Sequence, residues 1–227
     1  MNSTPQRTAL ITGAGRGLGL ALARALLARD WRVVVDARRA FHLADALPGA
    51  VVLAGDVTDP AHRDALARVV GGLDLLVNNA SDLGPSPLPR LADMPVDAAR
   101  RVYETNVLAP LALTQRLLPL LRASRGTVIN ISSDAGTEAY PGWGAYGSSK
   151  AALDQLTAIL AAEEPDLSAY SVDPGDMRTD MHQAAFPGED ISDRPEPESV
   201  VPALLRLIAT RPPSARLRAS DLAEVPA

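Results

Sequence analysis

The chain alternates between short apolar runs and longer stretches in which apolar residues recur with a helical period. The apolar runs are β-branched and uncharged in the middle, which is typical of strands buried on both faces of a sheet. They lie at residues 8–12, 31–36, 50–56, 73–79, 126–132 and, more weakly, 169–173. The stretches between them predict helices at residues 18–29, 60–70, 95–106, 109–122 and 146–163.

This alternation predicts an α/β fold with a doubly wound, mainly parallel sheet and helices on both faces, in three α/β/α layers. No repeat or linker divides the chain, so residues 1–227 are expected to form a single domain. Residues 186–197 are rich in proline and acids and precede a last predicted helix at 198–209, and residues 215–222 give only a weak strand signal. We expect a mobile substrate loop at about 176–198, either a lid or a solvated connector.

Composition narrows the classes of partner. The 22 basic and 27 acidic residues give a net charge of −5, which argues against nucleic acid or an anionic membrane surface. No apolar run of about 18 residues and no signal peptide are found, so a cytoplasmic protein is expected. Cysteine is absent, which excludes disulfides and thiol chemistry. His42, His62 and His182 are scattered without a carboxylate pattern, so we predict surface histidines and no metal site.

A glycine-rich segment, TGAGRGLG at residues 12–19, joins the first predicted strand to the first predicted helix. Glycines let the backbone approach a pyrophosphate, and the helix N-terminus supplies free N–H groups and the positive end of its dipole. A nucleoside-triphosphatase loop is excluded, because it requires Lys and Ser or Thr where this chain has Leu20 and Ala21. The spacing of Gly13, Gly17 and Gly19 resembles the T-G-x-x-x-G-x-G of the short-chain dehydrogenase/reductase family.

Further segments are similar to motifs of that family in the same order: DVTD at 56–59, NNAS at 78–81, TNV around Asn106, Ser133 placed 13 residues before Tyr146, and DPGDMRT at 173–179. The resemblance covers roughly residues 8–181. It implies a Rossmann-type fold, a nicotinamide cofactor, a small carbonyl or alcohol substrate, and a homodimer or homotetramer paired through helices 109–122 and 146–163. The residues expected to bind the cofactor are Gly13, Arg16, Gly17, Leu18, Gly19, Arg38, Asp56, Val57, Asn79, Ala80, Tyr146, Lys150, Pro174, Gly175 and Thr179.

YGSSK at residues 146–150 contains the single lysine among 22 basic residues. A lysine four residues after a tyrosine lies on the same helix face, where its ammonium is expected to lower the pKa of the phenol. Arginine is a broad planar fork and cannot replace it. The resemblance implies that Tyr146 exchanges a proton with the substrate oxygen, Ser133 hydrogen-bonds that oxygen, Lys150 holds the ribose, and Asn106 holds a water that connects Lys150 to solvent.

The second predicted strand ends in Asp36, Ala37 and Arg38. A carboxylate at this edge binds the ribose 2′-OH of NAD, whereas an arginine accommodates the 2′-phosphate of NADP. By the family pattern the acid position falls at Ala37, with Arg38 next to it and Arg16 in the glycine loop. We therefore favour NADP(H) over NAD(H). Arg39 either assists or is solvated.

Two further points stay open at this level. Ser81 replaces the last glycine of the family's N-N-A-G, at a cost of about 1 kcal/mol if φ is positive and none if the backbone is extended. Tyr140, Trp143, Met177 and Met181 either line a pocket for an apolar ketone or only pack in the interior.

Two other functions share the fold. One is a non-catalytic NADP-binding regulator, which the intact Ser133, Tyr146 and Lys150 disfavour. The other is an epimerase or dehydratase, which normally has a larger C-terminal substrate domain.

Overall fold

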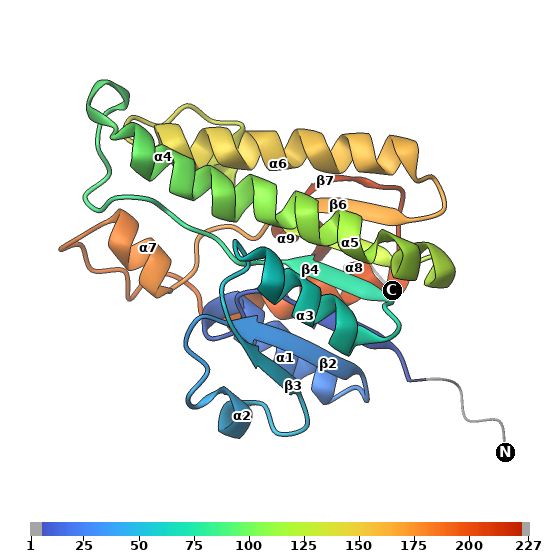
Figure 1. The fold of residues 1–227 in the computed structure, drawn as a ribbon. Helices are drawn as coiled ribbons and strands as arrows, with labels where there is room; N and C mark the ends of the chain where they lie inside the picture. Colours follow the sequence, from blue (N-terminus) through green and yellow to red (C-terminus); the bar gives the residue numbers. More distant parts are fainter. Residues whose placement is uncertain (1–5, 224–227) are drawn as a thin grey trace, which may run out of the picture.

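Seven parallel strands form one sheet in the order β3-β2-β1-β4-β5-β6-β7 (Figure 1). The structure is a computed structural model that describes residues 6–223. Its strands are β1 (Thr8–Ile11), β2 (Arg32–Ala37), β3 (Val51–Ala54), β4 (Leu75–Asn78), β5 (Thr127–Ile131), β6 (Ser168–Asp173) and β7 (Ala215–Arg218). The order reverses between β1 and β4, so a crevice opens at the carboxyl ends of these strands, where ligands of such sheets bind. The predicted doubly wound α/β fold is confirmed.

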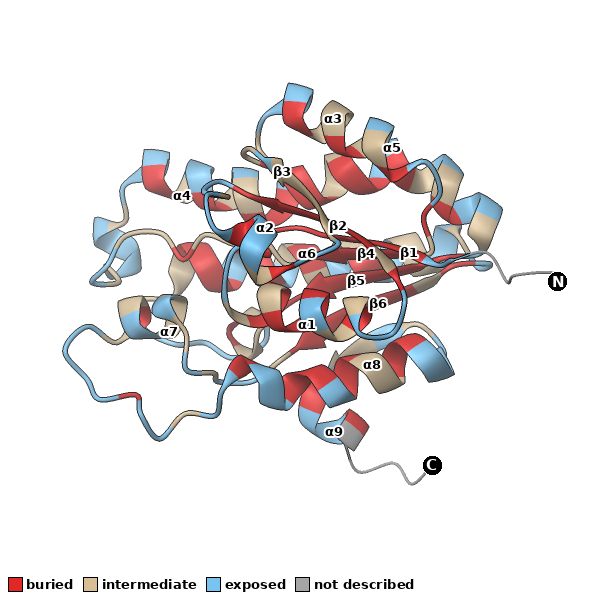
Figure 2. Cartoon of the chain, turned by 90° about the horizontal axis from the view of Figure 1, so that it is seen from below, coloured by how far each residue is buried: buried red, intermediate tan, exposed pale blue. Residues whose placement is uncertain are grey.

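Helices cover both faces of the sheet (Figure 2). One face carries α3 (Pro60–Val70), α5 (Ala109–Ser124) and α6 (Gly144–Glu163), and the other carries α1 (Gly17–Leu27), α2 (Leu43–Ala46), α8 (Val201–Thr210) and α9 (Ala219–Ala223). The remaining helical segments are α4 (Val96–Tyr103), α7 (Asp180–Ala185), the 3-10 turns η1 (Leu91–Asp93), η3 (Asp134–Gly136) and η4 (Pro197–Val200), and a π-helical turn η2 (Glu104–Leu108). The short α2 and α7 were not predicted.

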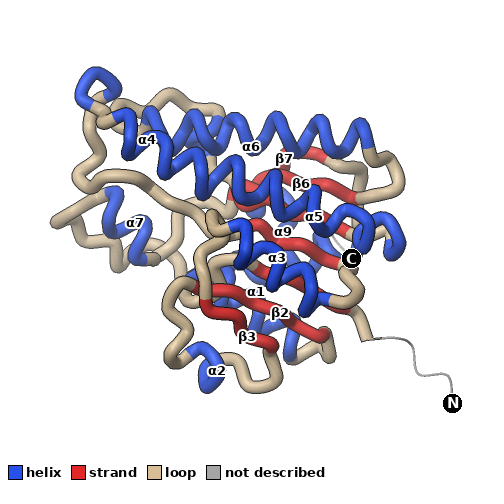
Figure 3. Tube along the Cα trace, in the orientation of Figure 1, coloured by secondary structure: helices blue, strands red, loops and turns tan. Residues whose placement is uncertain are grey.

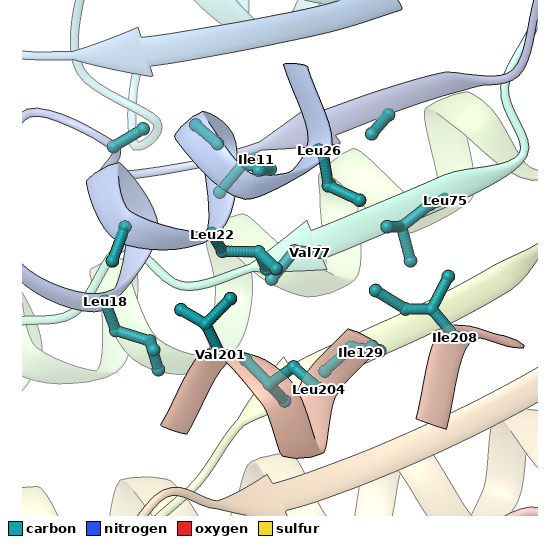
Figure 4. Packing of buried hydrophobic residues seen from close by; sticks show 14 of the residues in the cluster. Ile11, Leu18, Leu22, Leu26, Leu75, Val77, Ile129, Val201, Leu204 and Ile208 are labelled. Atoms are coloured by element: carbon teal, nitrogen blue, oxygen red, sulfur yellow. The ribbon is translucent and has the colours of Figure 1, made fainter. Parts of the chain in front are cut away.

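The buried strands divide their side chains between two cores. In β1, Ile11 points to the α1 and α8 face, where it packs with Leu22, Val77 and Leu204 (Figure 4), whereas Leu10 points to the α3 and α5 face. This alternation follows from the period of two in a strand. Because both faces are covered, the strands read as continuous apolar runs in the sequence.

The two helices predicted at residues 95–106 and 109–122 are joined into one helical run, α4–η2–α5. Pro110 has no N–H to donate to the carbonyl of Asn106 four residues earlier, and a π turn replaces the break expected there. The amide of Ala109 donates to the carbonyl of Glu104, five residues back. Single π turns are frequent at functional sites, and this one places Asn106 inside the fold.

The C-terminal part completes the architecture. The weak strand signal at residues 215–222 becomes the edge strand β7 followed by α9. Residues 176–198 contain α7, which stands apart from the sheet (Figure 3). Within residues 6–223, no helix is both long and apolar enough to cross a membrane.

Candidate active site

A cleft of about 840 Å³ lies at the carboxyl ends of the strands, between the glycine loop and α7. It brings together segments separated by more than 160 residues. Most of the predicted site residues line it: Gly13, Arg16, Gly17, Leu18, Arg38, Asp56, Val57, Asn79, Ala80, Ser133, Tyr146, Lys150, Pro174, Gly175 and Thr179. Gly19 and Asn106 are not among the lining residues.

The glycine loop is shaped to approach a ligand closely. Gly13 and Gly17 have φ of +66° and +57°, which favours glycine. A Cβ added at Gly13 would lie 2.7 Å from the Cα of Ala80, so the two backbones touch. The first turn of α1 has no side-chain cap and no acidic residue, so its N–H groups remain available for an anion. These features fit the pyrophosphate of a dinucleotide.

Gly19 and Asn79 support this loop from behind. The amide of Asn79 donates to the backbone carbonyls of Thr12 and Gly13 at 2.9 and 3.1 Å. A Cβ added at Gly19 would lie 2.5 Å from the Nδ2 of Asn79, so a side chain there would displace this brace. Gly19 therefore leaves room for this brace, and its direct contact with the cofactor remains a prediction.

A buried pair, Asp36 and His62, lies under the same loop. The N–H of Gly13 donates to one carboxylate oxygen of Asp36 at 2.6 Å, and the Nε2 of His62 lies 3.1 Å from the other. Both oxygens of Asp36 are thus bonded within the protein, and this buried residue lines the cleft together with Ala37 and Arg38. The prediction that His62 is a surface residue is wrong: it is buried, because Gly55 leaves room for its ring. His42 is exposed, as predicted.

Two predicted arginines line the cleft in different environments. Arg16 forms an ion pair with Asp180 of α7. Arg38 is exposed at the carboxyl end of β2. Burial would raise the pKa of Asp56, but hydrogen bonds from Thr58 and the charge of Arg38 bring that pKa below its usual value. Arg38 and Asp56 therefore lie near each other in the lining of the cleft.

Tyr146 and Lys150 lie one turn apart on α6, both buried. The Nζ of Lys150 lies 5.3 Å from the centre of the Tyr146 ring and donates to the carbonyl of Ile131 at 2.8 Å. Burial raises the pKa of Tyr146 to about 12, an effect reduced by hydrogen bonds with Ser81 and Ser133. Burial also lowers the pKa of Lys150 to about 8. The prediction of a lowered pKa for Tyr146 is thus wrong for the free protein, because desolvation of the buried phenol is the largest cause of the shift and the charges of Asp173 and Asp134 add to it.

Ser133 follows the end of β5. Its hydroxyl donates to the carboxylate of Asp134 at 3.0 Å and accepts from the N–H of Ala135, which caps the η3 turn. Tyr140 donates to the other oxygen of Asp134 at 2.9 Å and does not line the cleft. The backbone of η3 thus fixes the side of the cleft from which Ser133 faces Tyr146.

Asn106 is fully engaged by its neighbours. Its Nδ2 donates to the carbonyl of Asp82 and to the hydroxyl of Ser149, both at 2.9 Å. Its Oδ1 accepts from the N–H of Asp82 at 2.7 Å and from the hydroxyl of Ser81 at 3.2 Å. The side chain of Asn106 therefore braces the β4 end against α6. Its role in holding a water remains a prediction.

Ser81 has no positive φ, so the strain considered for this position does not arise. Its hydroxyl lines the cleft and interacts with the phenol of Tyr146. Sequence reasoning noted the departure from glycine but missed this contact. It also missed the carboxylates of Asp134 and Asp173, which raise the pKa of Tyr146. Their position just after β5 and at the end of β6 was the available signal.

The part of the cleft beside Tyr146 has an apolar lining, in which Leu83, Trp143, Met181 and Ala185 pack together. Met177 also lines the cleft, but it packs against the core beside α1 and α8. The Trp143 ring meets the Tyr146 ring edge to face at 5.6 Å and the Phe186 ring at 6.0 Å. His182, predicted on the surface, is instead half-buried and stacks on Phe186 at 4.9 Å.

The structure also bears on metal binding. In the part of the chain that the structure describes, no group of three or more His, Asp or Glu side chains is arranged to hold a metal ion.

Known proteins resemble this chain over most of its length. Residues 7–190 match the family model of the short chain dehydrogenases. The serine 3-dehydrogenase of Agrobacterium fabrum is 36% identical over 188 residues, 77% of this chain and 73% of that protein. A short chain dehydrogenase from Pseudomonas syringae superimposes with a TM-score of 0.88 at 34% identity, covering 94% of both chains. One from Shigella flexneri, solved in complex with NADP, gives a TM-score of 0.86 at 29% identity and covers 94% of this chain and 97% of that one.

Proposed function

The chain belongs to the short-chain dehydrogenase/reductase family, and from this premise we propose that it reduces a carbonyl substrate with NADPH, using Tyr146 as proton donor. As a family member it is a nicotinamide-dependent oxidoreductase. One observation carries the finer proposal: the phenol of Tyr146, the hydroxyl of Ser133 and the ammonium of Lys150 converge in one cleft with the glycine loop.

The nicotinamide, when bound, supplies or accepts the hydride; the proton chemistry belongs to the protein. Tyr146 is neutral in the free site, because its pKa is about 12, and can give its proton to the substrate oxygen. Ser133 donates a hydrogen bond to the same oxygen by turning its hydroxyl away from Asp134. Lys150 stabilises the phenolate that remains. The apolar side chains of Trp143 and Met181, which line the cleft, limit the access of water to these groups.

The pH dependence of the reduction follows from the pKa of Lys150. Burial lowers this pKa to about 8, so the stabilising ammonium is present below pH 8 and is lost above it. We expect kcat/KM for carbonyl reduction, which reports the free protein, to be flat in mild acid and to fall as the pH rises through about 8. Stopped-flow oxidation of NADPH across buffers measures this. Because Asp154 raises the pKa of Lys150, Asp154→Asn is expected to move the decline to lower pH. A flat profile up to about pH 10, the ordinary range of a free lysine, would contradict this assignment.

The residues at the carboxyl end of β2 favour NADP(H) over NAD(H) as the cofactor. Both oxygens of Asp36 are already bonded, to Gly13 and to His62, and the residue is buried, which disfavours a further bond to a ribose hydroxyl. Arg38 stands next to it, exposed at the cleft, and suits a 2′-phosphate. Arg16 is shared with Asp180 and must leave this partner before it contacts a phosphate.

The cofactor preference is tested with a panel of aldehydes and ketones and both reduced cofactors, by following the absorbance of the reduced ring. Wild-type protein is expected to use NADPH better than NADH. Arg38→Gln is expected to raise the KM for NADPH about 10- to 100-fold, because one charge-assisted phosphate contact is lost, and to change the KM for NADH less than about threefold. Arg29→Gln, an exposed arginine at the end of α1 and outside the cleft, is the matched control. Equal losses for both cofactors would refute the 2′-phosphate role of Arg38.

The apolar wall formed by Leu83, Trp143, Met181 and Ala185 beside Tyr146 supports an apolar, bulky carbonyl compound as substrate. Assembly into a dimer or tetramer through α5 and α6 remains a prediction. The exposed side chain of Ile159 on α6 is consistent with it. The cytoplasmic location likewise remains a prediction from sequence.

A further inference from the structure

The edge strand β7 presents different faces to the two helical layers. Leu217 packs into the core beside α1 and α8. Arg216 and Arg218 alternate with it and point to the other face, where α6 lies, as the period of two requires. In the register of β6 and β7, Arg216 pairs with Ser171 and Arg218 with Asp173. Two arginines of the last strand thus extend toward the carboxyl ends of the neighbouring strands, where the cleft lies.

Arg216 joins two separate parts of the site. Its Nη2 donates to the backbone carbonyl of Ser133 at 2.9 Å, and its Nε donates to Oδ2 of Asp154 at 2.9 Å. The other oxygen of Asp154 accepts from the hydroxyl of Ser171. The side chain of Arg216 is 27% exposed and that of Asp154 13% exposed, so the pair is shielded from most of the screening that weakens surface ion pairs.

One partner of Arg216 belongs to a residue with a proposed catalytic role, and the other lies one helical turn from such a residue. The carbonyl belongs to the residue whose hydroxyl faces Tyr146, so holding it fixes the backbone from which Ser133 projects. Asp154 lies one helical turn after Lys150 on α6. A Cβ added at Gly136 would lie 3.2 Å from Oδ2 of Asp154 and 3.1 Å from the backbone N of Ala151, so η3 packs directly on this turn of α6.

We propose that Arg216 is a positioning residue of the reaction: its guanidinium holds the backbone of Ser133 and the Lys150–Asp154 turn of α6 in fixed relation across the end of the cleft. The inference rests on the proposed function, because it concerns the same catalytic groups. Arginine suits this task, since its planar fork donates in two directions at once, whereas a lysine ammonium is a single point charge. Displacing catalytic groups by about 1 Å is enough to lower turnover up to about 100-fold.

Arg218 offers a matched control on the same strand and the same face. It is 53% exposed, and its Nε lies 4.0 Å from the carboxylate of Asp173, at the limit of an ion pair. A pair of this kind contributes little in water. Arg218→Gln therefore removes the same charge from the same strand without removing a hydrogen bond to the site.

The first test compares kcat, the Kd for NADPH and the Tm of Arg216→Gln, Arg216→Lys and Arg218→Gln. Arg216→Gln is expected to lower kcat about tenfold with the Kd for NADPH within about twofold of wild type, Arg216→Lys to recover part of this loss, and Arg218→Gln to stay within about twofold. If Arg216→Gln lowers the Tm by several degrees, Arg216→Lys distinguishes a loss of positioning from a loss of stability, because it retains the charge and one hydrogen bond. Wild-type kcat in Arg216→Lys together with a destabilised Arg216→Gln would overturn the proposal in favour of a purely structural role.

The second test is a double-mutant cycle with Ser133→Ala. If Arg216 acts by placing the Ser133 hydroxyl, Arg216→Gln loses most of its effect once that hydroxyl is absent, and the further loss in the double variant is less than about twofold. Losses that multiply both here and in the matching cycle with Asp154→Asn would overturn the proposal, because Arg216 would then act through neither of its two partners. Wild-type protein without turnover on any carbonyl would refute the proposed function and this inference together, whereas an active wild type with an unchanged Arg216→Gln would refute the inference alone.

Discussion

Tyr146→Phe is expected to lower kcat for carbonyl reduction about 1,000-fold while cofactor affinity stays within about threefold. The substitution removes one oxygen and keeps the ring that packs against Trp143 and Ala135. A positioned acid contributes about 100- to 10,000-fold by supplying the proton as charge develops on the substrate oxygen. The measurement combines single-turnover oxidation of NADPH with a binding titration, so that the chemical step and cofactor binding are read separately.

The fold is not expected to suffer from this change. The phenol is buried, and its pKa is raised to about 12 chiefly by that burial, so the hydroxyl is poorly solvated in the free protein. Tyr140→Phe is the matched control: it removes a phenol oxygen from a residue six positions earlier that bonds Asp134 and does not line the cleft. Tyr140→Phe is expected to keep turnover within about threefold of wild type. Full activity in Tyr146→Phe would show that another group supplies the proton.

Lys150→Arg is expected to lower kcat/KM at least about 100-fold although the formal charge is unchanged. The ammonium is enclosed between α6 and the end of β5, where it donates to the carbonyl of Ile131 at 2.8 Å. A guanidinium is larger and planar and cannot occupy that space without displacing Tyr146 or Ile131. The measured quantities are kcat/KM with NADPH and the Tm of the variant.

Two further variants distinguish a loss of catalysis from a loss of folding. Lys150→Met keeps a flexible chain of similar length without a charge, so it is expected to fold with an unchanged or higher Tm and to lose activity to a similar extent. Arg122→Lys, at an exposed ion pair with Glu164 far from the cleft, controls for the exchange of the two basic residues and is expected to be silent. An active Lys150→Arg enzyme would show that a positive charge alone suffices at this position.

The parts of the site that sequence predicted are those with a local signature. Gly13 and Gly17 adopt positive φ within a strand–loop–helix segment, and Tyr146 and Lys150 share a helix face because they are four residues apart. The buried strands were recognisable from apolar runs, since both faces of the sheet are covered.

What the sequence did not reveal depends on contacts between distant residues. Asp36 and His62 are 26 positions apart and meet only because Gly55 leaves space for the imidazole, so the histidine was misplaced on the surface. The raised pKa of Tyr146 follows from enclosure by several segments, which no spacing records. Arg216 lies on a strand that alternating arginines made hard to recognise in the sequence, and it is 83 residues from Ser133, so no local spacing indicated their contact.

The most direct test of the central claim, that this cleft passes a hydride to a carbonyl carbon while Tyr146 protonates the oxygen, is the fate of deuterium from NADPH labelled at the reactive carbon of its ring. With both hydrogens of that carbon replaced by deuterium and an apolar ketone that the wild-type protein reduces, we expect one deuterium on the carbinol carbon of the product for each NADPH consumed. Tyr146→Phe is expected to form this labelled product about 1,000-fold more slowly under the same conditions. Consumption of NADPH without label in the alcohol, or labelling at an equal rate by Tyr146→Phe, would contradict the account.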